Sequence, residues 1–352
     1  MARASKNDPL KNALSFEKPV REMDLKLAEL EARIAEAGEE AEASDQEEAD
    51  RLRGERDELL EQVVSELTLW QRIQLSRHMD RPVSADYLEA LCTDVVELHG
   101  DRTFGDDRAI FTGFATLGKR RLLVVAHRKG RTTEARIACN WGCAHPEGYR
   151  KALRCMQLAV RMNLPILTLI NTPGAYPGIG AEERGQASAI AWNIFEMSRL
   201  PVPIVSVVIG EGGSGGALGI GVCDRLLVLE NAYYSVISPE GCASILWKDG
   251  SRAEEAASAL KLSTDALSEL GVADEIVPEP KGGAHRDKAD AARLLGEAVE
   301  RQFAELSKLG SKQLINARAE KYRGLGSFQP DPAGAYPAQA QAPEDSVEES
   351  QS

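Results

Sequence analysis

Two glycine-containing turns each follow an apolar run, and the backbone amides of such turns can stabilise a negatively charged oxygen. Residues 171–178 follow the run 166–170, and residues 210–216 follow the run 204–209. Short continuous apolar runs are typical of buried strands, and the residues after the second turn indicate the start of a helix, whose first amides carry partial positive charge. Glycine also serves tight turns and close packing. Two such turns at the carboxyl ends of parallel strands, where ligands bind, favour an oxyanion site.

The second turn departs from the nucleotide-binding motifs. It lacks the Gly-Lys-Ser/Thr ending of a P-loop, so no lysine reaches the phosphates. It also comes late in the chain, whereas a dinucleotide-binding fold has its glycine turn after the first strand.

Residues 212–216 do fit the G-x-S-x-G nucleophile elbow of serine hydrolases, with Ser214 as the nucleophile. His285 would then be the base, with Asp224, Asp249, Asp265 or Asp274 as the third member. The five-residue pattern matches easily in any glycine run, and His285 follows a proline-containing segment without the features of a catalytic base. The hydrolase is therefore the alternative hypothesis.

Further polar and cysteine residues carry weaker signals. Arg128, Lys129 and Arg131 form a basic patch that suits an anionic ligand, although such clusters are usually surface ion pairs. Cys139 and Cys143 are four apart with His145 nearby, but nothing local completes a zinc site. We expect reduced thiols and no metal on this chain.

The remaining sequence indicates the elements that position the two turns. Apolar spacing predicts helices over 17–37 and 51–77 as an N-terminal hairpin, with an acid-rich solvated connection or frayed helix end at 39–50. From residue 110, apolar runs alternate with helical stretches, which predicts an α/β fold with a sheet covered on both faces. The runs are 122–126, 166–170, 204–209, 225–229 and 233–237, and the helices are 146–162, 182–198, one from 215 and 288–323. We expect a helical arm over 1–80, a catalytic domain over 81–326 and a disordered acidic tail over 327–352.

Composition narrows the class of protein. The chain has 352 residues, 43% of them apolar, and a net charge of −13, which argues against broad nucleic-acid affinity. Its apolar runs are far shorter than the roughly 20 residues of a membrane span. We expect a cytoplasmic protein.

At these same residues the chain resembles the carboxyltransferase α subunits of bacterial multi-subunit acetyl-CoA carboxylase. The resemblance extends from about residue 14 to 325 and is specific because the motifs are long and ordered. The matching stretches are LSFEKP at 14–19, GDR at 100–102 with DD at 106–107, PEGYRKALR at 146–154, TPGAYPG at 172–178, GAEERGQ at 180–186, IGEGGSGGAL at 209–218, SVISPEGCASILWK at 235–248, PEP at 278–280 and GGAHR at 282–286.

The resemblance implies a crotonase-like (ClpP/crotonase) ββα superhelix. It also implies transfer of a carboxyl group from carboxybiotin, on the biotin carboxyl carrier protein, to acetyl-CoA. The product is malonyl-CoA for fatty acid biosynthesis. A β subunit in an α2β2 carboxyltransferase would carry the zinc and most acetyl-CoA contacts, and a separate biotin carboxylase would consume the ATP.

By the same resemblance, backbone amides in the two turns would hold the biotin ureido oxygen, flanked by further residues on the biotin side. The amide donors would be Gly174, Ala175, Gly215 and Gly216, the flanking residues Tyr176, Gly213, Ser214 and Ala217, and the contacts to CoA phosphates Arg128, Lys129 and Arg131. The family usually has Asp where this chain has Asn171, which puts any role for that carboxylate in doubt.

Overall fold

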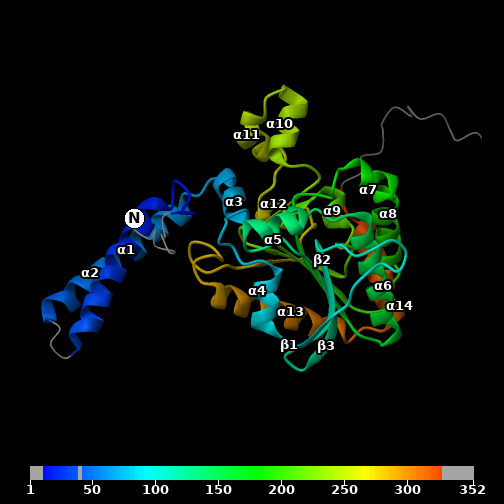
Figure 1. Ribbon diagram of the computed structural model, residues 1–352, viewed down its shortest axis with the longest axis horizontal. Coiled ribbons are helices and arrows are strands. Elements are labelled where there is room, and N and C mark those ends of the chain that lie inside the picture. The colour runs from blue at the N-terminus through cyan, green and yellow to red at the C-terminus, as the bar shows by residue number, and fades with distance from the viewer. Residues whose placement is uncertain (1–10, 39–41, 327–352) are drawn as a thin grey trace, which may run out of the picture.

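The computed structural model describes residues 11–38 and 42–326 (Figure 1). The predicted tail over 327–352 lies outside the described residues, as does part of the predicted acidic connection.

One eight-stranded sheet forms the centre of the protein, with the order β1-β2-β3-β4-β5-β6-β8 and β7 paired to β5. The first three strands are antiparallel and the pairs from β3 onward are parallel. Every residue of β4 and β5 is buried, as continuous apolar runs predict. The strands are β1 Cys92–Glu97, β2 Ile110–Leu117, β3 Arg120–His127, β4 Ile166–Thr172, β5 Ile204–Gly213, β6 Arg225–Leu229, β7 Tyr233–Ser235 and β8 Glu275–Val277.

The N-terminal helices form a hairpin that projects from the body of the protein (Figure 1). Helix α1 spans Lys18–Ala37 and α2 spans Ala43–Ser65, and Leu27 and Leu30 of α1 pack with Ala49 of α2. Residues 43–50 of the acid-rich segment are thus helical. The helix predicted over 51–77 is two helices, because Thr68 forms a capping box with Gln71 and starts a separate helix, α3.

Most helices of the body cover the sheet or its ends. Helix α6 contacts β2 and β3, and α13 contacts β5, β8 and α4. None of the helices among the described residues is both long and apolar enough to cross a membrane. The helices are α3 Leu69–Ser76, α4 Ser84–Leu91, α5 Thr133–Ala138, α6 Pro146–Arg161, α7 Ile179–Glu183, α8 Gln186–Met197, α9 Ser214–Leu218, α10 Pro239–Trp247, α11 Ala253–Ala259, α12 Thr264–Glu269, α13 Lys288–Leu306 and α14 Ser311–Arg323, with 3-10 turns at Asn140–Gly142 and Gly250–Arg252.

Three predicted boundaries differ from the structure. The helix predicted over 182–198 is broken at Gly185, which adopts a left-handed conformation with φ 80°. The helix predicted over 288–323 is interrupted before Gly310, the N-cap of α14. Gly210, Gly212 and Gly213 belong to β5 and not to a turn, so the second turn begins at Ser214.

Candidate oxyanion site at the ends of two strands

The two glycine turns leave neighbouring parallel strands and lie side by side. Strand β4 pairs with β5 in parallel, and Thr172 at the end of β4 lies opposite Gly212 near the end of β5. The first turn therefore begins beside the start of α9. This juxtaposition is the one that the sequence predicts.

The turns approach each other so closely that only glycine fits at two positions. A β-carbon added to Gly216 would lie 2.4 Å from the carbonyl carbon of Gly174 and 2.5 Å from the nitrogen of Ala175. One added to Gly213 would lie 2.1 Å from the carbonyl oxygen of Pro173. These glycines allow main chain to pack directly on main chain.

Several amides at this contact have no hydrogen-bond partner among the residues that the structure describes. Within residues 11–38 and 42–326, the N–H groups of Ala175, Gly215 and Gly216 donate no hydrogen bond. The first-turn amides of a helix have no intrahelical acceptor, and α9 begins at Ser214 without a side-chain cap. The Gly174 amide differs, because it donates to the Thr172 hydroxyl at 3.1 Å. Three predicted donors are thus open, and Gly174 is engaged.

The carbonyl of Gly216 accepts a hydrogen bond from a side chain of α6. The Tyr149 hydroxyl donates to it at 3.3 Å. His127, at the end of β3, is fully buried near the same carbonyl, and neither of its ring nitrogens has a hydrogen-bond partner in the described part of the chain. Burial lowers the pKa of His127 to about 3, so the ring is neutral at pH 7. Neither residue has a sequence signal that links it to the turn, because both contacts depend on tertiary packing.

The serine hydrolase triad is not assembled. Ser214 has a left-handed φ of 53°, a strained conformation that resembles a nucleophile elbow. However, His285 lies in a different cluster, where its Nε2 is 2.6 Å from Glu17 Oε1 and its ring stacks on His78. Asp224 is paired with the buried Arg318.

A buried acid lies next to the second turn. Glu211 of β5 pairs with Lys129, with Arg77 at 2.7 Å and with the Tyr233 hydroxyl at 3.1 Å. Burial alone would raise the pKa of Glu211, but the Lys129 and Arg77 cations hold it below its ordinary value. A cavity of about 210 Å³ adjoins this network and is lined in part by Arg77, Lys129, Pro173 and Glu211.

The predicted basic patch is engaged in ion pairs. Arg128 makes two hydrogen bonds to Glu97, at 2.7 and 2.8 Å. Arg131 contacts Asp86 and Glu89, each at 2.8 Å. Like Lys129, both arginines therefore have carboxylate partners, and contact with CoA phosphates stays a prediction.

Asn171 ties the two strand ends together. Its Oδ1 accepts the Glu211 amide at 3.2 Å, and a β-carbon on Gly210 would lie 2.8 Å from the same oxygen. This role needs an acceptor and not a negative charge, which explains how Asn can stand at this position.

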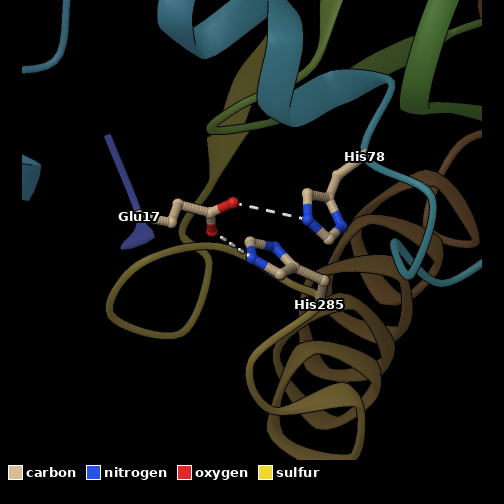
Figure 2. Close-up of side chains that lie close together, drawn as sticks. All are labelled: Glu17, His78 and His285. Carbon is tan, nitrogen blue, oxygen red and sulfur yellow. Dashed lines mark hydrogen bonds and ion pairs between the residues drawn. The ribbon is translucent and has the colours of Figure 1, made fainter. Parts of the chain in front are cut away.

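Other predicted residues fall around the first turn. Tyr176 stacks on His145 with ring centroids 4.2 Å apart, and its amide donates to Ala144. Burial raises the pKa of the Cys139 and Cys143 thiols. In the part of the chain that the structure describes, the one set of three side chains grouped closely enough to hold a metal ion is instead Glu17, His78 and His285 (Figure 2).

The sheet, with its crossover helices and paired strand-end turns, has the crotonase-like fold of acyl-CoA carboxyltransferases. The profile of the family described as "Acetyl co-enzyme A carboxylase carboxyltransferase-like" matches residues 13–326, and the chain belongs to this family. Two relatives named acetyl-coenzyme A carboxylase carboxyl transferase subunit alpha are similar along most of their length. That of Geobacter metallireducens is 52% identical over 315 residues, and that of Thermus thermophilus 50% identical over 315 residues; each alignment covers 90% of this chain and 98% of the relative.

Solved structures support the fold class. Transcarboxylase 12S, with methylmalonyl-coenzyme A and methylmalonic acid bound, is similar with a TM-score of 0.50 and 20% identity, over 62% of this chain and 41% of that chain. A Pseudomonas malonate decarboxylase hetero-tetramer in complex with coenzyme A is similar with a TM-score of 0.54 and 16% identity, over 68% of this chain and 94% of that chain. At these identities the similarity concerns the fold alone, and it confirms the predicted crotonase-like class.

Proposed function

We propose that this chain is the α subunit of an acetyl-CoA carboxylase carboxyltransferase. It transfers the carboxyl group of carboxybiotin, presented by the biotin carboxyl carrier protein, to acetyl-CoA and so forms malonyl-CoA for fatty acid biosynthesis. The family membership supports the reaction class. The observation that carries the site is the convergence of the open Ala175, Gly215 and Gly216 amides where β4 and β5 end.

The residues present fit a group with a developing negative oxygen. Carboxybiotin supplies the carboxyl group and a ureido oxygen that gains negative charge as the carboxyl group leaves. The three open amides, aided by the positive end of α9, would donate to that oxygen. They cost no reorganisation, because the close contact of Gly216 with Ala175 already fixes both turns. No ionisable side chain of this chain is required, and Gly174 would join only after releasing Thr172.

Ser214, Gly213, Ala217 and Tyr176 surround these amides and would contact the biotin side of the substrate. Ser214 is exposed, whereas Gly213 and Ala217 are buried. Among the basic residues proposed for CoA phosphates, Arg131 has the most exposed side chain, at 47%. A phosphate there would replace Asp86 and Glu89 as its partner.

The proposal includes a β subunit in an α2β2 assembly, which would provide most acetyl-CoA contacts and the zinc. A separate biotin carboxylase would consume the ATP, and the complex would work in the cytoplasm. Within this chain, residues 1–80 would form the helical arm, 81–326 the catalytic domain and 327–352 an acidic tail.

The test is reconstitution. The chain is purified alone and together with its β subunit, and malonyl-CoA formation is assayed with free carboxybiotin and acetyl-CoA. Activity only in the combined sample supports a shared site. Full activity of the isolated chain contradicts it.

A further inference from the structure

A buried carboxylate joins two stacked imidazoles at the base of the helical hairpin (Figure 2). Glu17, just before α1, has one oxygen 2.6 Å from His285 Nε2 and the other 3.4 Å from His78 Nε2. The two rings stack with centroids 4.0 Å apart. All three side chains are at most 6% exposed. Residues from three distant parts of the sequence thus meet in one cluster.

One hydrogen bond anchors the cluster, between Glu17 and His285, whereas His78 Nε2 and His285 Nδ1 have no hydrogen-bond partner among the described residues. His78 Nδ1 accepts the Asp80 amide at 3.1 Å, which places the His78 proton on Nε2, facing Glu17. Burial opposes ionisation of Glu17, but the hydrogen bond to His285 and the nearby His78 ring hold its pKa below the ordinary value. While this proton stays on Nε2, that nitrogen has no lone pair with which to bind a metal ion. The arrangement therefore favours a hydrogen-bonded clamp.

The clamp holds a segment that also contacts the end of β5. His78 lies within residues 76–81, which run from the last residue of α3 into the connection to α4. On one side of it, Arg77 bonds to Glu211 at 2.7 Å. On the other side, Arg81 donates to the Ile209 carbonyl at 2.9 Å and pairs with the buried Glu279. Both contacts lie within the last five residues of β5, which lead into the turn that carries Gly215 and Gly216.

We propose that Glu17 is a positioning residue for carboxyl transfer: by holding His78 and His285, it fixes residues 76–81 against β5 and so fixes the amides of the second turn. This inference rests on the proposed function. It gives the helical hairpin a role in the alignment of the site, in addition to packing.

The hairpin has other ties that provide controls. Asp24 of α1 pairs with Arg286 at 2.8 Å, and Glu61 of α2 pairs with Lys281 at 3.0 Å. The Glu61 pair is exposed and touches neither histidine. Its loss should loosen the hairpin without moving residues 76–81.

The experiment compares Glu17→Gln, His78→Leu, His78→Gln and the control Glu61→Gln in the αβ complex. We expect Glu17→Gln and His78→Leu to lower kcat roughly tenfold to hundredfold, with KM for acetyl-CoA changed less than twofold, because misplacement of catalytic groups acts on kcat. His78→Gln retains an N–H donor for Glu17 and should recover most of that loss. Glu61→Gln should have the same kcat and the same KM for acetyl-CoA as the parent.

The outcomes separate this inference from the proposed function. If the parent complex forms no malonyl-CoA, the proposed function fails. If the parent is active and His78→Leu and His78→Gln have equal kcat, or Glu17→Gln keeps full kcat, the clamp has no positioning role. Should Glu17→Gln fail to fold, the comparison of kcat between His78→Leu and His78→Gln decides whether the clamp has a positioning role. One equivalent of zinc or iron per chain in the purified parent, lost in Glu17→Gln, would overturn the clamp in favour of a metal site.

Discussion

A β-carbon on Gly216 would lie 2.5 Å from the amide nitrogen of Ala175, although the two residues belong to turns on different strands. Atoms at that distance overlap, so the contact exists only because residue 216 is glycine. It brings the amides of the two turns together and makes them one site.

Replacement of Gly216 by valine should therefore abolish most carboxyl transfer. The side chain would push the two turns apart, and loss of one oxyanion donor typically costs a factor of about 10²–10³ in kcat. Steady-state assays of the αβ complex measure this, and size-exclusion chromatography confirms assembly. Gly215→Ala is the matched comparison, because its β-carbon would meet only Ile190 carbons at 3.7 Å. We expect a much smaller loss there, and equal losses in both variants would contradict the contact's importance.

Ser214→Ala should leave carboxyl transfer largely intact, because the proposed chemistry uses the main chain at this turn. A serine hydrolase would lose nearly all activity on the same change. The φ of 53° at Ser214 also predicts that Ser214→Gly is at least as stable as the parent. Parallel assays of malonyl-CoA formation and of thermal unfolding check both statements. If Ser214→Ala lowered the rate of carboxyl transfer more than a hundredfold, the Ser214 hydroxyl would have to take part in the reaction.

Tyr149→Phe should destabilise the protein by about 1–3 kcal/mol, because it removes the hydroxyl that satisfies the buried Gly216 carbonyl. Chemical denaturation measures the change in the free energy of unfolding. Tyr87→Phe is the control, since the Tyr87 hydroxyl is buried but has no hydrogen-bond partner among the described residues. That change should be neutral or stabilising, and a similar destabilisation in both variants would argue against the Tyr149 contact.

The free energy of unfolding should fall as the pH is lowered below about 6.5, in part because of His127. Burial lowers its folded-state pKa to about 3 from 6.5. Between these values the unfolded chain binds a proton that the folded protein excludes. His127 therefore has no effect on the free energy of unfolding above pH 6.5, and below it lowers this free energy by about 1.4 kcal/mol per pH unit down to pH 3. Unfolding measured from pH 7 to 5 should show a shallower pH dependence in His127→Asn than in the parent. An unchanged slope would mean that His127 titrates normally.

The sequence predicts the elements of the sheet that bear the site, because β4 and β5 are buried on both faces and therefore read as continuous apolar runs. Strand β1 was not predicted, since it lies at the sheet edge with most of its side chains exposed and has no apolar pattern. The break at Gly185 depends on a left-handed conformation that a helical pattern does not reveal.

For the site, the two turns were predicted from their position after the strands, but their supports were not. Tyr149 and His127 reach Gly216 from separate elements, and Glu17 meets His285 across 268 residues of sequence. Such contacts follow from the packing of distant segments and have no local signal. The resemblance included Glu17 and His285 in its motifs, but only the structure shows that they touch.

The most direct test of the account is a crystal structure of the αβ complex with biotin bound. We predict that the ureido oxygen lies within about 3.2 Å of the amide nitrogens of Ala175 and Gly216, the range of an N–H···O hydrogen bond. A ureido oxygen bound by side chains elsewhere, with these amides facing solvent, would contradict the central claim.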